Sequence, residues 1–248
     1  IAVTGPRQSG KTTLVRRFFS DKPYVSLENM DERSFALEDP VGFLDRFPEG
    51  AVLDEVQRTP VLFSYLQERL DGQGRMGSFI LTGLQHFQLM ESISQTLAGR
   101  VAMLHLLPFS MSELSDVSIL PEDADTALLR GGYPPIHTRS VSPGTWLSSY
   151  VSTYVERDVR TLVNIRDLSA FQDFLRVCAG RAGQLVNRSS LGAECGITHN
   201  TAKAWLSILQ TGFILFFVWP YFRNFNKRLV RTPKLYFHDT GLLCRILG

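Results

Sequence analysis

The first nineteen residues constrain the fold more than any other part of the chain. The apolar or β-branched residues 1–4 are typical of a buried strand and run directly into GPRQSGKT, residues 5–12. A segment with helical spacing follows at 13–19. Strand, glycine-rich loop and helix in this order, with Lys and Thr closing the loop, form a phosphate-binding P-loop, or Walker A motif. The motif predicts an α/β fold built on a parallel sheet.

The residue types in this loop suit ATP bound with Mg²⁺. Gly5 and Gly10 let the backbone curl until successive N–H groups point at phosphate oxygens, and the helix N-terminus adds its positive dipole end. Lys11 is expected to reach the β and γ phosphates, and Thr12 to offer its hydroxyl to Mg²⁺. A glycine-rich turn with an incidental lysine is the alternative. The predicted nucleotide-binding residues are Gly5, Pro6, Arg7, Gln8, Ser9, Gly10, Lys11, Thr12 and Thr13.

A second acidic site follows at residues 50–55, GAVLDE, a buried-strand run that ends in two carboxylates. A parallel sheet would present that end beside the P-loop, which is the Walker B arrangement. We expect Asp54 to hold Mg²⁺ through its water shell and Glu55 to orient or deprotonate the attacking water. An ordinary strand end would look the same in isolation, but the P-loop upstream favours the functional interpretation.

Two further catalytic candidates lie between residues 78 and 107. A third strand at 78–83 ends in Thr82, which could sense the γ phosphate or its water, or could simply begin a turn. Arg100 lies between a predicted helix, His86–Leu97, and the apolar strand 101–107. An arginine there can act as a finger toward a neighbouring subunit's nucleotide, or it can cap its own helix or pair locally.

The chain resembles predicted bacterial and archaeal AAA-superfamily ATPases in which the ATPase module is joined to a C-terminal domain of unknown function. The resemblance runs along nearly the whole chain, and it implies ATP binding, slow hydrolysis and a poorly defined biological task. The segments that carry it are GPRQSGKTTL, YVSLE, VLDEVQRTP, FILTG, LAGRV, PFSMSEL, GGYPP, TYVERDV and KLYFHDTGLL. One departure is Leu84, where the family usually has serine after LTG. Sensing of hydrolysis would then be weaker or fall to Thr82.

Residues 121–180 show apolar residues at spacings of three and four, notably over 146–163 and 171–179, which predicts a helical lid and linker. AAA lids often supply a basic residue to the nucleotide, and Arg157 in TYVERDV is the candidate for this second sensor. A bridge from Arg157 to Asp158 or to a neighbouring helix is the alternative.

The last third of the chain predicts a winged helix-turn-helix. A short helix near 189–194, a turn and a second helix over 199–210, with Thr198 as its N-cap, have the spacing of that motif. Strands at 213–219 and 235–237 are joined by a segment that holds five basic residues and no acid between them: Arg223, Lys227, Arg228, Arg231 and Lys234.

This segment could bind double-stranded DNA through phosphate contacts. The candidate DNA-binding residues are His199, Asn200, Lys203, Arg228 and Arg231. Winged helices in multidomain ATPases also serve as packing or protein-binding modules, so a protein partner remains the alternative.

Composition narrows the function classes. The net charge of +2 is too small for the chain to bind nucleic acid through its overall charge, so such binding would need a local basic patch. No apolar run approaches the roughly 20 residues of a membrane helix, so no membrane partner is expected. Three widely spaced cysteines and five histidines without metal-binding spacing favour neither a disulfide framework nor a zinc site, and suit reducing cytoplasm. Because the chain begins without methionine, we expect a fragment of a longer protein.

We therefore predict a P-loop core of AAA type at 1–120, a helical lid at 121–180 and a small winged-helix domain at 181–248. The expected function is Mg²⁺-dependent ATP binding and slow hydrolysis coupled to conformational change, on DNA or a protein partner and as a homo-oligomer. The alternative is an ATP-switched DNA-binding or scaffold module with negligible turnover. A kinase lacks a recognisable acceptor pocket, and a GTPase would need NKxD, whereas Asn226-Lys227 is followed here by Arg228-Leu229.

Overall fold

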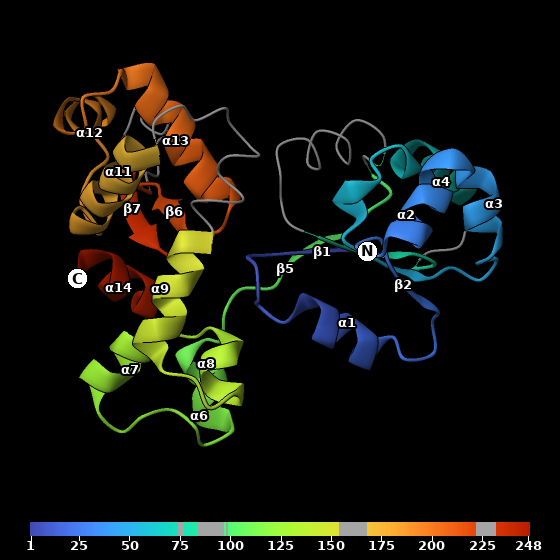
Figure 1. Cartoon of the computed structure of the whole chain (residues 1–248), viewed down its shortest axis with the longest axis horizontal. Helices are drawn as coiled ribbons and strands as arrows, with labels where there is room; N and C mark the ends of the chain where they lie inside the picture. The colour runs from blue at the N-terminus through green and yellow to red at the C-terminus, as the bar shows by residue number, and fades with distance from the viewer. Residues whose placement is uncertain (74–76, 84–96, 98, 154–167, 222–231) are drawn as a thin grey trace. The chain divides into compact units, whose positions relative to one another are not determined.

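A computed structural model shows that the 248-residue chain divides into two compact units, Ile1–Leu107 and Pro108–Gly248. The structure describes all residues except 74–76, 84–96, 98, 154–167 and 222–231 (Figure 1). The buried hydrophobic clusters found in the first unit share no residue with the cluster in the second. Each unit is therefore described by itself.

The first unit is built on a sheet of five parallel strands in the order β2-β3-β4-β1-β5. The strands are β1 (Ala2–Thr4), β2 (Tyr24–Ser26), β3 (Val52–Asp54), β4 (Ile80–Gly83) and β5 (Met103–His105). β1 lies between β4 and β5, so the strand order reverses beside it. In open α/β sheets, ligands bind outside the carboxyl ends of the strands at such a point.

Both faces of this sheet are buried, which explains why its strands are apolar runs without alternation. Leu53 on β3 and Leu81 on β4 belong to one hydrophobic cluster, whereas the adjacent residues Val52 and Ile80 belong to another. Successive side chains of a strand point to opposite faces, so the clusters lie on opposite sides of the sheet. The helical elements that cover it are α1 (Lys11–Phe18), α2 (Met30–Glu38), α3 (Pro40–Asp45), the 3-10 helix η1 (Val56–Arg58) and α4 (Leu62–Gln73).

The second unit is mainly helical, with one small antiparallel sheet of two strands, β6 (Leu215–Val218) and β7 (Lys234–Phe237). Its described helices are α6 (Met111–Asp116), α7 (Ala124–Arg130), α8 (Pro134–Thr138), α9 (Pro143–Thr153), α11 (Leu168–Gly180), α12 (Arg188–Glu194), α13 (His199–Thr211) and α14 (Thr240–Leu247).

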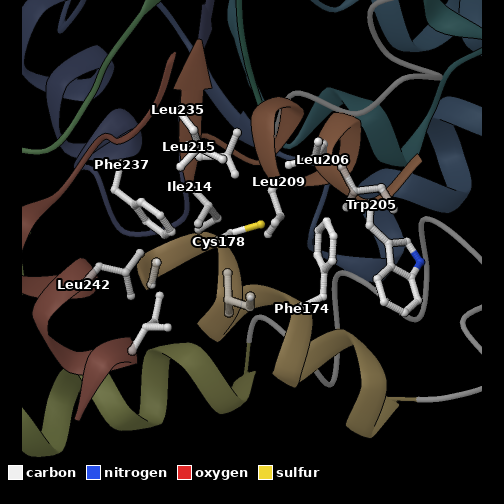
Figure 2. Close-up of a cluster of buried hydrophobic side chains, with 14 of the residues drawn as sticks. Phe174, Cys178, Trp205, Leu206, Leu209, Ile214, Leu215, Leu235, Phe237 and Leu242 are labelled. Atoms are coloured by element: carbon white, nitrogen blue, oxygen red, sulfur yellow. The ribbon is translucent and has the colours of Figure 1, made fainter. Parts of the chain in front are cut away.

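A hydrophobic cluster joins several of these elements, and Figure 2 shows part of it. Phe174 and Cys178 on α11 pack with Leu209 on α13, and Leu215 on β6 and Leu242 on α14 complete the same cluster. Side chains from both of the segments predicted as lid and as winged helix therefore contribute to one core. The division of the chain into three domains stays a prediction.

A buried carboxylate connects three of the segments that carry the family resemblance. Asp239 is the N-cap of α14, and its oxygens accept hydrogen bonds from the backbone N–H groups of Leu242 (2.6 Å) and Gly132 (2.7 Å). The carbonyl of Gly132 in turn accepts from the N–H of Phe109 (2.7 Å). PFSMSEL, GGYPP and KLYFHDTGLL thus meet at one point of the second unit. Burial raises the pKa of Asp239, and these N–H donors oppose the rise.

The α/β class with a parallel sheet is confirmed, and so are several elements of the second unit. α11 includes the predicted helix 171–179, and α12 and α13 cover the predicted helical pair. Thr198 is the N-cap of α13 and accepts from the N–H of Thr201 (3.1 Å). The winged helix as a whole stays a prediction, because the expected wing includes residues 222–231, outside the described part.

The other two predicted helices, 146–163 and 86–97, lie partly outside the described residues. α9 (Pro143–Thr153) overlaps the predicted helix 146–163 over residues 146–153. The predicted helix 86–97 falls almost entirely on residues outside the described part. Among the helices that the structure describes, none has the length and apolarity that crossing a membrane requires.

Candidate functional site

The predicted Walker residues meet at the carboxyl edge of the first unit's sheet. Thr4 ends β1 and leads into the P-loop, Asp54 ends β3, and Thr82 lies near the end of β4. β4 pairs with both β1 and β3, and the register places Thr82 beside Val3 of β1. Residues that are far apart in sequence are thus brought to one edge by the strand order alone.

The P-loop backbone has the curled form that phosphate binding needs. Gly5, Gln8 and Gly10 have φ values of 155°, 61° and 93°, and Gly10 is the N-cap of α1. A Cβ atom on Gly5 would lie 2.1 Å from the carbonyl oxygen of Leu106, so a larger residue does not fit there. The first N–H groups of α1 open toward this loop, which is the geometry of an anion site.

Lys11 lies inside the curl of its own loop. Its Nζ donates to the carbonyl oxygens of Gly5 (3.1 Å) and Pro6 (2.7 Å), and the side chain is buried. Burial lowers the pKa of Lys11 to about 8, while the nearby carboxylates of Glu55 and Asp54 act to raise it. The structure therefore brings the P-loop lysine and both Walker B acids into one electrostatic group.

Asp54 is the centre of the site, and three hydroxyl groups donate to its carboxylate. Oδ2 accepts from Thr12 Oγ1 (2.9 Å) and from the hydroxyl of Tyr24 (2.6 Å), and Oδ1 accepts from Thr82 Oγ1. These donors come from α1, β2 and β4. Asp54 is 4% exposed, so its carboxylate is oriented by buried or half-buried partners on three elements.

Tyr24 is a site residue that the sequence reasoning missed. Its ring lies under the guanidinium of Arg16, with 4.6 Å from the guanidinium carbon to the ring centroid. Burial and the hydrogen bond to Asp54 raise the pKa of Tyr24 well above its usual value, which keeps the hydroxyl a donor. The available signal was its place in YVSLE, on a strand that a parallel sheet could set beside Walker B.

The oxygen atoms at Asp54 fit Mg²⁺. The hydroxyl of Thr12 and the carboxylate of Asp54 are hard oxygen donors 2.9 Å apart at the mouth of the P-loop. Mg²⁺ is usually held by one or two protein groups together with substrate phosphates and water. Within the described part of the chain, no group of three or more His, Cys, Asp or Glu residues could hold a metal ion. The donor set therefore suits an ion that arrives with phosphate.

Glu55 has an uncommon backbone conformation. It lies in the left-handed region, with φ 59° and ψ 41°, and is the N-cap of η1. Its carboxylate oxygen Oε2 accepts from the side-chain amide of Gln57. The second Walker B acid is therefore held by a contact of its own, distinct from the hydroxyl groups around Asp54.

Arg100 lies away from the other predicted catalytic residues of its own unit. It precedes β5 and thus belongs to the amino edge of the sheet, opposite the P-loop edge. Its guanidinium forms two hydrogen bonds with Asp71 on α4, at 2.6 and 3.0 Å. This is the local pairing that sequence reasoning left open. A role as an arginine finger toward another subunit stays a prediction.

The other predicted residues are only partly within the described chain. His199, Asn200 and Lys203 lie in the first turns of α13, as expected for the start of a recognition helix. Leu84, Arg157, Arg228 and Arg231 lie outside the described residues.

Comparison with known families assigns both halves of the chain. Residues 1–115 match an AAA domain family, and residues 121–248 match a domain of unknown function, DUF8612. The chain belongs to the AAA superfamily of P-loop proteins. Its AAA domain thus carries the Walker site described above, and the resemblance of its second half to a domain of unknown function is confirmed.

Two curated relatives cover the whole chain. The uncharacterized proteins Rv2008c of Mycobacterium tuberculosis and Mb2031c of Mycobacterium bovis are each 31% identical to it over 252 aligned positions. The alignment covers 100% of this chain and 56% of each relative, so the chain spans little more than half of their length.

The chain is also similar to solved structures, at low scores. The Orc1 protein of Aeropyrum pernix in complex with DNA aligns with 99% of this chain and 85% of its own, at 15% identity and a TM-score of 0.35. RuvB of Thermotoga maritima aligns with 88% of this chain and 81% of its own, at 21% identity and a TM-score of 0.39. Neither score is high enough to add to the family assignment.

Proposed function

We propose that this protein binds ATP with Mg²⁺ and hydrolyses it. The observation that carries the proposal is the group around Asp54, where Thr12 of the P-loop and Thr82 of β4 both donate to one buried carboxylate. A P-loop with an incidental lysine would not need a buried acid oriented by hydroxyls from separate elements. Family membership supports nucleotide binding independently.

The residues of the P-loop bind the phosphates. Gly5 and Gly10 give the loop its curl, and Lys11 exchanges its two backbone carbonyl partners for phosphate oxygens, since its ammonium then gains an anionic partner. Thr12 and Asp54 would hold Mg²⁺, which would neutralise part of the phosphate charge. Arg7, Gln8, Ser9, Pro6 and Thr13 complete the proposed nucleotide contacts.

Glu55 orients the attacking water or accepts its proton. The role requires a carboxylate close to the γ phosphate, and the electrostatic coupling of Glu55 to Lys11 supports that placement. Thr82 is proposed as the sensor, and its hydroxyl is engaged with Asp54 in this structure. Arg100 is proposed as an arginine finger toward the nucleotide of a neighbouring subunit. Arg157 is proposed as a second sensor that contacts the nucleotide of its own subunit.

The test is steady-state phosphate release from ATP with Mg²⁺, measured on the wild-type protein and on Lys11→Ala and Glu55→Gln. We expect Glu55→Gln to keep ATP affinity and to lower turnover by about 100-fold or more, because it loses the base. Lys11→Ala should lose ATP affinity as well. Lys22→Ala and Glu68→Gln, both outside the site, are the matched controls and should behave as wild type.

An ATP-switched DNA-binding module is the second candidate, and one observation favours it. Arg188 on α12, His199 on α13, Trp219 after β6 and Thr232 before β7 line one pocket whose described lining includes no acid. Trp219 is 58% exposed, so its indole is accessible to a DNA ligand. DNA would then bind at the start of α13, with ATP acting as a switching ligand.

Adding double-stranded DNA to the measurements of phosphate release and of ATP affinity separates the two candidate functions. Turnover that rises with DNA or with protein concentration supports a DNA-responsive, assembling ATPase. Tight ATP binding without turnover, together with salt-sensitive DNA retention that Lys203→Ala, Arg228→Ala and Arg231→Ala weaken, supports the switched module. A protein without ATP affinity contradicts both.

A further inference from the structure

Gln57 is the one residue of η1 whose side chain reaches a Walker B acid. Its amide nitrogen Nε2 donates to Oε2 of Glu55, two residues earlier in the chain. Its other end lies against β4, where a Cβ atom on Gly83 would be 2.0 Å from Gln57 Oε1. The amide thus extends from Glu55 to the residue that follows Thr82.

The backbone explains how a residue only two positions away can turn back to Glu55. The left-handed conformation of Glu55 starts η1 abruptly, and the N–H of Arg58 donates to the carbonyl of Glu55 (3.0 Å) to close the turn. A residue other than glycine or asparagine rarely adopts this conformation without compensation from its surroundings. The contact between Gln57 and Glu55 is one such compensation.

Charge fixes the orientation of the amide. An ionised carboxylate can only accept hydrogen bonds, so the NH₂ group of Gln57 must face Glu55 and its carbonyl oxygen must face Gly83. That oxygen is buried and has no hydrogen-bond partner among the described residues. Since the oxygen has no such partner, the contact with Glu55 is what holds the amide in this orientation.

We propose that Gln57 is a positioning residue for Glu55, holding the carboxylate in the direction from which it meets the attacking water. This inference rests on the proposed function, ATP hydrolysis with Glu55 as the water-orienting residue. It assigns to Gln57 no contact with ATP or with Mg²⁺. Gly83 takes part because only a residue without Cβ leaves room for the amide at that place.

The first test compares Gln57→Glu and Gln57→Leu with wild type. Glutamate has nearly the shape of glutamine but cannot donate to Glu55, and it adds a like charge. We expect each variant to lower kcat by about 10-fold or more, while KM and the directly measured Kd for ATP stay within about twofold, because a misplaced water-orienting group affects the chemical step. Gln67→Glu on α4 is the matched control and should leave kcat unchanged.

The second test asks whether Gln57 acts through Glu55. In the Glu55→Gln background, adding Gln57→Leu should change the residual turnover by less than about twofold, because residues that act as a unit are strongly non-additive. Gly83→Ala should lower kcat in the same direction as Gln57→Leu, since its Cβ displaces the amide. Thermal unfolding of each variant shows whether it remains folded.

Three results would overturn the inference. If Gln57→Glu keeps wild-type kcat, the amide serves only to fill space. If Gln57→Leu lowers turnover equally in the wild-type and Glu55→Gln backgrounds, it does not act through Glu55. If wild-type protein binds ATP but shows no turnover, the proposed function fails and this inference with it, whereas wild-type turnover with unchanged Gln57 variants refutes the inference alone.

Discussion

At the scale of single residues, the site is a set of charges and donors that hydrogen bonds within the protein hold in place. Lys11 is held by two carbonyls, Asp54 by three hydroxyls and Glu55 by an amide. Preorganised groups of this kind lose little orientation when the substrate binds.

The lowered pKa of Lys11 makes ATP binding depend on pH. Below about pH 8 the amine of the free protein is protonated and ready for phosphate, and above it the amine must first take up a proton. We therefore expect ATP affinity without Mg²⁺ to fall as pH rises through 8, by up to about tenfold per pH unit. Calorimetry at pH 9 in buffers of different ionisation enthalpy should show proton uptake. Affinity that is constant from pH 7 to pH 10 would contradict this.

At the scale of elements, Asp239 holds the start of α14 and the loop after α7 together through buried N–H donors. Asp239→Ala should lower the free energy of unfolding by about 3 kcal/mol, because it removes a helix cap and leaves buried N–H groups unpaired. Denaturant unfolding measures the change. Asp173→Ala, on the exposed side of α11, should stay within about 0.5 kcal/mol. A loss from Asp239→Ala no larger than this control would mean that the carboxylate is dispensable.

The sequence predicted those elements whose signal is local. The strands before Gly5 and up to Asp54 are short apolar runs beside recognisable motifs, and the N-cap at Thr198 follows from a residue type at a helix start. Tyr24 and Gln57 were not predicted as site residues. Their roles depend on strand order and on a left-handed turn, neither of which leaves a periodic pattern in the chain.

The segments outside the Walker motifs that carry the family resemblance illustrate the same limit. GGYPP and KLYFHDTGLL carried the resemblance, but no chemistry could be derived from them. In the structure they meet through Asp239 and Gly132, and Gly131 is in the left-handed region with φ 64°. A Cβ atom on Gly131 would lie 2.5 Å from an oxygen of Asp239. Close packing between distant segments explains these residues, and sequence spacing cannot show it.

At the scale of the whole molecule, the two units have separate hydrophobic clusters, and the Walker site belongs to the first alone. A ligand that binds only the folded form of one unit stabilises that unit. We expect calorimetric unfolding to show two transitions. Mg²⁺-ATP at 100 times its Kd should raise the free energy of unfolding of one unit by about 2.7 kcal/mol and leave that of the other unchanged.

The Lys11→Ala variant identifies the transition that belongs to the AAA domain. It should still unfold in two transitions, but ATP should no longer raise the temperature of either one. Glu55→Gln, which keeps ATP affinity, should retain the shift without turnover, so heating does not consume the ligand. If ATP instead raises both transitions equally, or if unfolding occurs in one step at every ATP concentration, the units unfold as one cooperative body. Binding energy at the P-loop would then be available to the DUF8612 domain, as a nucleotide-driven change of conformation requires.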